Sequence, residues 1–99
     1  MTIDEINAMP AGVKMDAAVA EVLGWENITP ESTQKYSTEI AAAWELLKQV
    51  DDARFWLRQL LSKSWSCRFD FLDDIIVADG NTAPLAICRA FLLCKLANN

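Results

Sequence analysis

The first half of the chain carries apolar side chains at the spacing of amphipathic helices. One stripe consists of Met15, Val19, Val22 and Leu23. It predicts a helix that starts at Val13 and stops at Gly24, because glycine readily adopts the left-handed conformation that ends helices. Residues 1–9 precede it as a short helix or a turn, which Pro10 and Gly12 interrupt.

A second apolar stripe predicts another helix after a polar loop over residues 26–35. It consists of Ile40, Ala43, Trp44, Leu47 and Val50. Ser37 or Thr38 is the expected N-cap, since a hydroxyl accepts a hydrogen bond from the first amides of a helix. The adjacent acids Asp51 and Asp52 are expected to end this helix.

The next segment changes from a helical period to alternation. The apolar residues Trp65, Cys67, Phe69 and Phe71 alternate with the polar residues Ser66, Arg68 and Asp70. This period of two predicts a half-buried strand, and residues 75–77 form a further short strand after a turn at Asp73 and Asp74. Segment 54–61 fits a strand or a helical extension; we favour a strand, because a hairpin arm needs a neighbour. Short connections then make the three strands an antiparallel meander.

The final helix, from Leu85 to Leu96, is apolar on nearly every side. Asn81 or Thr82 is its expected cap, and Pro84 fits its first turn because proline lacks an amide hydrogen. Such a helix either lies at the centre of the core, or packs one face on the sheet and the other on a second subunit.

We favour the second arrangement for this helix, because a domain of this size has difficulty enclosing a helix on all sides. The sequence therefore predicts a homo-oligomer held partly by the last helix. Phe91 or Leu93, whichever faces outward, is the expected contact at the interface.

Composition limits the classes of function. Ninety-nine residues, 53% of them hydrophobic, are expected to fold as one domain over residues 1–99. A net charge of -5 argues against binding to duplex nucleic acid, which requires cationic side chains. The start of the chain holds Asp4 and Glu5 instead of a secretory signal, and no apolar run approaches the roughly 20 residues that span a bilayer. We therefore expect a cytoplasmic protein that does not bind membranes.

The chain offers little for catalysis or metal binding. It has no histidine, so a Ser–His or Cys–His system is impossible within one subunit. Cys67, Cys88 and Cys94 lack the CxxC spacing of metal sites and are expected to be reduced, buried thiols. The paired acids at 51–52 and 73–74 fit solvated turns. We expect no enzymatic activity, no cofactor and no metal site.

Several residues are nevertheless candidates for binding a ligand or a partner. They are Trp25, Tyr36, Ser37, Thr38, Arg68, Asn81, Thr82 and Arg89. An aromatic ring and two hydroxyls at 36–38 could grip a polar ligand, although we favour the simpler explanation that Ser37 or Thr38 caps the helix and Tyr36 packs before it. Asn81 and Thr82 precede a helix N-terminus, where an anion can bind. Arg89 is charged within an apolar helix and must meet solvent, a carboxylate or an anionic ligand.

Three runs of the sequence occur in the same order as in a known family. They are Met15–Glu21 with Gly24 and Trp25, Tyr36–Trp44, and Thr82–Ala90. Together they resemble the phage ABA sandwich domain. The resemblance implies a helix–sheet–helix sandwich, an origin in a phage or prophage, and no established biochemical activity. Segment 54–77 carries the least resemblance, and is where a function private to this protein is expected.

The pattern and the resemblance together predict an α+β fold. The expected order is helix, helix, three strands, helix, arranged as an αβα sandwich-like domain with a three-stranded antiparallel meander.

Two classes of function fit this sequence. The first is a non-enzymatic phage or prophage accessory protein that binds a host or phage protein, including as an inhibitor of host defence. The second is an oligomer that sequesters an anionic, nucleotide-like small molecule by means of Arg89, Tyr36 and residues near Asn81. Arginines that converge with aromatic rings at a subunit interface would favour the second. Arginines spread over the surface beside a tryptophan patch would favour the first.

Overall fold

The computed structural model of the protein describes residues 1–29, 31–50 and 53–97. The helices are α1 Ile3–Ala8, α2 Val13–Val22, α3 Ile40–Leu47 and α4 Ala83–Ala97, and the strands are β1 Arg54–Gln59, β2 Trp65–Asp70 and β3 Ile75–Gly80. The strands form an antiparallel sheet in the order β1-β2-β3. The predicted α+β class, the layered packing of helices and sheet, and the meander are confirmed, and segment 54–61 contains a strand.

The first two helices follow local signals in the sequence. Thr2 and Glu5 form a capping box at the start of α1. α2 ends at Val22, and Gly24 follows it with a φ of +88°, the left-handed conformation that glycine adopts without strain. The predicted stop at Gly24 is confirmed.

The start of α3 differs from the prediction. The N-cap residue is Glu39, which makes no side-chain cap, so neither Ser37 nor Thr38 caps this helix. Ser37 instead donates its hydroxyl hydrogen bond to the carboxylate of Asp16 on α2. Asp16 is buried, and a buried carboxylate without hydrogen bonds is costly, whereas the amides of an exposed helix end can bond to water. The expected end at Asp51 and Asp52 lies outside the described residues.

The apolar stripe of α3 is also displaced from the predicted one. Its buried residues are Ala42, Ala43, Leu46 and Leu47. Trp44, which the stripe placed in the core, is 43% exposed and packs edge-on against Phe55 of β1, with ring centroids 5.7 Å apart. Ile40 is similarly exposed. The helix therefore turns its small residues inward, which lets it approach α4 closely.

α4 is the centre of the core, and the arrangement we favoured from the sequence is wrong. Phe91 and Leu93 are both buried within the chain, so neither faces outward to form an oligomer contact. The helix contacts β2 and β3 on one side and α1, α2 and α3 on the other. Three short helices cover the parts of α4 that the sheet leaves free, which a packing of only two elements could not do.

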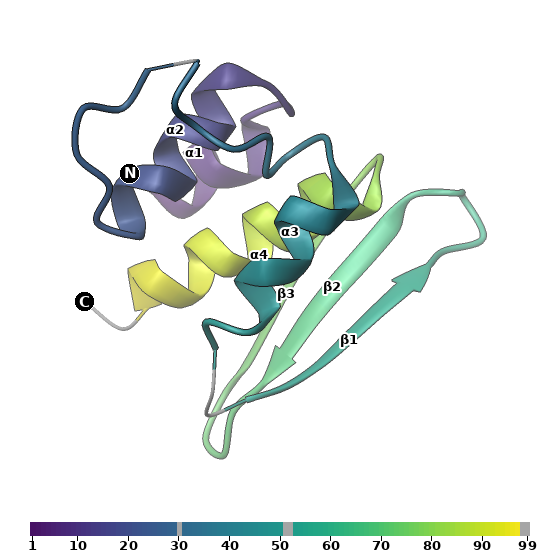
Figure 1. Ribbon diagram of the computed structural model, residues 1–99. Helices are drawn as coiled ribbons and strands as arrows, with labels where there is room; N and C mark the ends of the chain where they lie inside the picture. The colour runs from purple at the N-terminus through teal and green to yellow at the C-terminus, as the bar shows by residue number, and fades with distance from the viewer. Residues whose placement is uncertain (30, 51–52, 98–99) are drawn as a thin grey trace.

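The layers are visible in Figure 1, where α4 lies between the sheet and the pair α1 and α2. α3 packs on α4 and reaches β1 through Trp44. The described helices all lie on the same face of the sheet, so the opposite face is open. Leu57, Cys67 and Ala78 stand in register and point toward α4. Within the described ranges, no helix is both long and apolar enough to cross a bilayer.

Candidate functional site

The open face of the sheet is the candidate site. Alternation along each strand places on it Arg54, Trp56, Arg58, Ser66, Arg68, Asp70, Ile75, Val77 and Asp79. Its three apolar side chains all remain strongly exposed, Trp56 at 47%, Val77 at 48% and Ile75 at 53%. A large aromatic ring on a sheet face that no described helix covers is unusual, because a sheet normally buries its apolar side chains against another layer.

Trp56 and Arg68 form the centre of this face. They stand opposite each other on β1 and β2, and the guanidinium carbon of Arg68 lies 5.3 Å from the centroid of the indole ring. This is the geometry of a cation–π contact, which holds both side chains in place.

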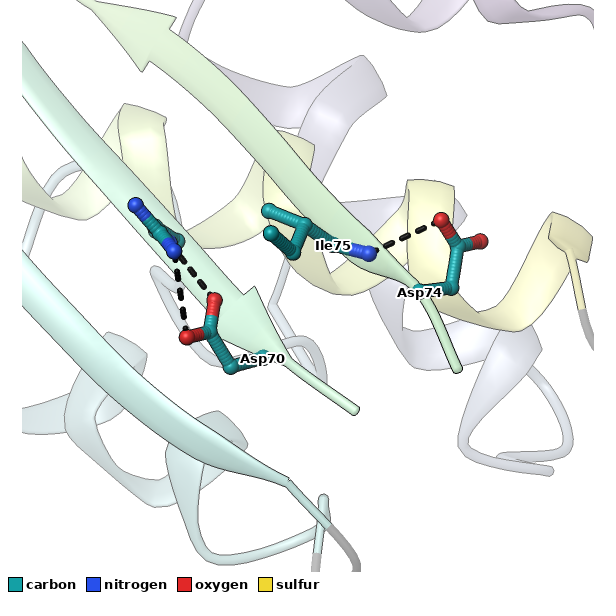
Figure 2. Close-up of polar contacts among 4 residues, drawn as sticks. Asp70, Asp74 and Ile75 are labelled. Carbon is teal, nitrogen blue, oxygen red and sulfur yellow. Dashed lines mark hydrogen bonds and ion pairs between the residues drawn. The ribbon is translucent and has the colours of Figure 1, made fainter. Parts of the chain in front are cut away.

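Asp70 holds the other side of Arg68. The carboxylate accepts hydrogen bonds from Nε at 2.5 Å and from Nη2 at 3.2 Å (Figure 2). These bonds raise the pKa of Arg68 above its ordinary value. The arginine is therefore fixed in orientation between a ring and a carboxylate, without being removed from solvent.

A shallow hollow of about 400 Å³ lies beside this pair. It is lined by Trp56, Arg58, Ser66, Arg68 and Val77. The hollow combines an indole ring, an aliphatic side chain, a hydroxyl and two guanidinium groups. Such a surface can hold an apolar side chain of a partner and pair with carboxylates around it.

The charge of the open face is opposite to that of the whole chain. Three of the four arginines of the protein, Arg54, Arg58 and Arg68, lie on it together with two aspartates. The chain carries a net charge of -5, so its excess of acids lies on the remaining surface. The face is consequently the place where an anionic group would dock with least repulsion.

Arg89, a candidate from the sequence, lies on the other side of the sheet and has structural partners. Its Nη1 donates to the carbonyl of Asp79 at 2.8 Å, and its Nη2 donates to the carbonyl of Met9 at 3.0 Å. Burial lowers the pKa of this group. The structure does not bring Arg89 and Arg68 together.

The candidates at 36–38 also stabilise the fold. Tyr36 is buried and packs edge-on against Trp25, with ring centroids 6.3 Å apart. Ser37 donates its amide and its hydroxyl to Asp16 Oδ1, at 2.8 Å and 2.6 Å. Thr38 is exposed. The aromatic ring and one of the two hydroxyls therefore face the interior, away from solvent.

The candidates at the start of α4 have simple local roles. The hydroxyl of Thr82 accepts a weak hydrogen bond of 3.4 Å from the amide of Leu85, so the predicted cap is confirmed. Asn81 is exposed beside it. Neither residue lines the hollow on the open face.

Of the residues on the open face, only Arg68 was a candidate from the sequence, and Trp56 and Arg58 on β1 are the most important of those that the sequence reasoning missed. The signal was present, because Arg54, Trp56 and Arg58 alternate with Phe55 and Leu57. The signal is ambiguous, because each of the two alternating sets contains an aromatic residue. The alternation alone therefore does not say which set faces the core. Only the position of α4 decides that.

The cysteines offer no reactive group. All three are buried and form no disulfide, and every cysteine of the chain lies in the described part. Burial raises the pKa of the Cys67 thiol to about 12 and also raises that of Cys88. A thiol must ionise to act as a nucleophile, so these two are inert near neutral pH.

Comparison with known proteins identifies a matching family and a similar crystal structure. The phage ABA sandwich domain matches residues 14–92. The fold is similar to that of a phage protein from Bacillus cereus ATCC 14579, whose 2.0 Å crystal structure superposes with a TM-score of 0.68. The two are 24% identical, and the match covers 87% of this chain and 92% of that one. A search of curated proteins found no match. The family match spans most of the chain and includes α2, α3, the whole sheet and most of α4, so this protein belongs to the phage ABA sandwich domain family.

Proposed function

We propose that this phage protein acts without catalysis, by binding a protein partner on the open face of its sheet. The observation that carries the proposal is the Trp56–Arg68 pair at the centre of a face that no described helix covers. Tryptophan and arginine are the residues that most often dominate the energy of protein interfaces. Here both are already held in a fixed geometry, so binding would cost little side-chain entropy.

The chemistry of the face indicates the chemistry of the partner. Ile75 and Val77 extend the apolar surface along β3, while Arg54 and Arg58 flank Trp56 on β1. A complementary surface would present an apolar side chain to the hollow and carboxylates to the arginines. The proposed partner is therefore a protein with an acidic rim around an apolar centre.

A small anionic ligand is less well supported as the occupant. The hollow lies on a sheet face, not between elements, and Arg68 already pairs with Asp70. Tyr36, Asn81 and Arg89, which the sequestering hypothesis required, do not line it. Small-molecule sites usually bury most of their ligand, which an open face does not do.

The partner would be met in the cytoplasm of the host cell. A host protein and another phage protein both fit the proposed chemistry. A role as an inhibitor of host defence requires a host partner, so the identity of the bound protein decides between these two roles.

A photo-crosslinking amino acid at Val77 tests the proposal in infected cells. Val77 lines the hollow, and its side chain is not one of the two that form the Trp56–Arg68 contact. We expect a discrete cross-linked protein whose attached peptide contains Asp or Glu, and a several-fold loss of that product when Trp56→Ala is added. A cross-linked nucleotide or other small molecule in place of a protein would contradict the proposal.

The matched control carries the same amino acid at Val13 on α2. This valine is 60% exposed but lies among the helices, away from the open face. We expect no product, or a different one, from this position. The same product from both positions would mean that contact is not specific to the open face.

A further inference from the structure

We infer that the free edge of β1 binds a second copy of this chain, strand to strand and antiparallel, so that two sheets join into one of six strands. The inference does not rest on the partner proposed above, because it concerns the edge of the sheet and not its face. It relocates the predicted homo-oligomer from α4, which is buried, to β1.

The hydrogen-bond pattern identifies which backbone groups of β1 point outward. The amide of Leu60 donates to the carbonyl of Ser64 at 2.7 Å, and these two residues stand opposite each other in the register. In an antiparallel ladder such pairs alternate, so Arg58, Trp56 and Arg54 also bond to β2. Phe55, Leu57 and Gln59 therefore direct their amides and carbonyls away from the sheet.

The side chains of β1 are exposed on both faces of the sheet, which is the second observation. Trp56 lies on the open face, while Phe55 is 41% exposed on the opposite face beside Trp44. Among the six residues only Leu57 is half-buried. A strand added along this edge would cover apolar surface on both sides at once.

The other edge strand, β3, has one of its outward backbone groups already occupied. The odd-numbered residues of β3 point away from β2, because the carbonyl of Asp74 accepts from the amide of Phe71 and the alternation continues from there. One of the resulting outward groups, the carbonyl of Asp79, is occupied by Arg89. Natural sheets protect edges in this way against unwanted pairing. β1 has no such protection among the described residues.

Charge selects the register of the pairing. A two-fold axis through Trp56 would place Arg54 of each copy opposite Arg58 of the other copy. An axis through Arg58 would place the two copies of Arg58 opposite each other. An axis at Leu57 sets Trp56 against Arg58 of the second copy, and Phe55 against Gln59. This register opposes no like charges and pairs the outward backbone groups with one another. It also overlaps more of β1 than an axis at Phe55 or Gln59 would.

The consequence for the molecule is a continuous open face twice as wide. The two Trp56 side chains would lie near the two-fold axis, each beside an arginine of the other copy, in a second cation–π contact. The strand β1 would become central, and the two β3 strands, each with its Arg89 contact, would form the outer edges.

Sedimentation equilibrium of the purified chain tests the pairing. We expect the wild type to show twice the mass of one chain. Gln59→Pro should weaken the dimer by roughly tenfold or more, because proline removes an outward amide in both copies and its ring obstructs the second strand. The change spares the ladder to β2, since the amide of Gln59 does not bond to it.

Gln59→Ala is the matched control, because it removes the same exposed side chain and keeps the amide. It should remain dimeric. A monomeric wild type would overturn the inference. So would a Gln59→Pro protein that is folded by circular dichroism and as dimeric as Gln59→Ala.

Cysteine cross-linking tests the register. Leu57→Cys should form a covalent dimer under mild oxidation, because residues paired across an antiparallel ladder have Cα atoms about 5.5 Å apart, within disulfide range. Phe55→Cys should not, since its copies would lie about 13 Å apart along the strands. Both variants carry Cys67→Ala, because Cys67 stands opposite Leu57 on β2 and would otherwise compete for the new thiol within one chain. The other two native cysteines are buried. Equal cross-linking of both variants would exclude this register.

Discussion

At the scale of single residues, the packing of β3 on α4 depends on one glycine. A Cβ atom added to Gly80 would lie 2.8 Å from the backbone nitrogen of Ala86 and 3.1 Å from Cγ of Leu85. The sequence places this glycine directly before Asn81 and Thr82, the candidate anion site at the start of α4. The structure gives it a different reason, since only a residue without a side chain lets the end of β3 approach the first turn of α4.

Gly80→Ala should therefore destabilise the protein by overpacking. We expect a loss of about 1–3 kcal/mol in the free energy of unfolding, because the closest atom is backbone and cannot move aside cheaply. Urea unfolding followed by tryptophan fluorescence measures it. The neighbouring Asn81→Ala is the control and should change stability by less than about 0.5 kcal/mol. Equal stabilities for the two variants would show that the contact relaxes freely.

At the scale of elements, the segment before α3 is tied to the start of α2. Asp16 is buried on α2 and accepts both the amide and the hydroxyl of Ser37. The same hydroxyl oxygen accepts from the amide of Gly12, the N-cap residue of α2, at 2.9 Å. The segment before α3 is thus tied across a long loop to the start of α2 by the hydrogen bonds of one serine.

Ser37→Ala should loosen this connection. It removes a hydrogen bond to a buried carboxylate, so we expect a loss of about 1.5–3 kcal/mol in the free energy of unfolding. Thr38→Ala removes an exposed hydroxyl of the next residue and should cost less than about 0.5 kcal/mol. Chemical denaturation of the two variants side by side gives the comparison. If Thr38→Ala were the more costly change, the connection would not run through Ser37.

At the scale of the whole molecule, stability depends on keeping the thiols of the core neutral. Cys67 of β2 is fully buried, as is Cys88 of α4. Burial raises the pKa of Cys67 from 9.0 to about 12. Between these two values the unfolded chain gives up the proton of this thiol while the folded chain keeps it. The free energy of unfolding must therefore fall as the pH rises through this window.

Cys67→Ala should reduce that dependence on pH. Unfolding measured at pH 8 and at pH 10.5 should show a smaller loss of stability in the variant, because one of the thiols that ionise only on unfolding is gone. Tyr36, whose pKa is also raised by burial, titrates in both proteins and cancels in the comparison. Identical losses in the two proteins would mean that Cys67 ionises as readily when folded.

The sequence by itself determined the elements and the family. The alternation in residues 65–71 specified β2, Gly24 ended α2, and three matching runs indicated the phage ABA sandwich domain. These conclusions succeeded because period, turn chemistry and family motifs are local properties of the chain. The prediction about α4 failed because its apolar surface could be satisfied within the monomer or by a second subunit, and its sequence is the same in both cases.

Only the tertiary structure decided which surfaces remain open. Trp56 and Arg68 lie 12 residues apart and meet because β1 pairs with β2 in one register. Trp44 seemed a core residue and is partly exposed, while Phe91 seemed an interface residue and is buried. Burial depends on what the rest of the chain places over a side chain, so a local pattern cannot specify it. The candidate site, which consists of what the helices leave uncovered, could therefore be located only from the assembled fold.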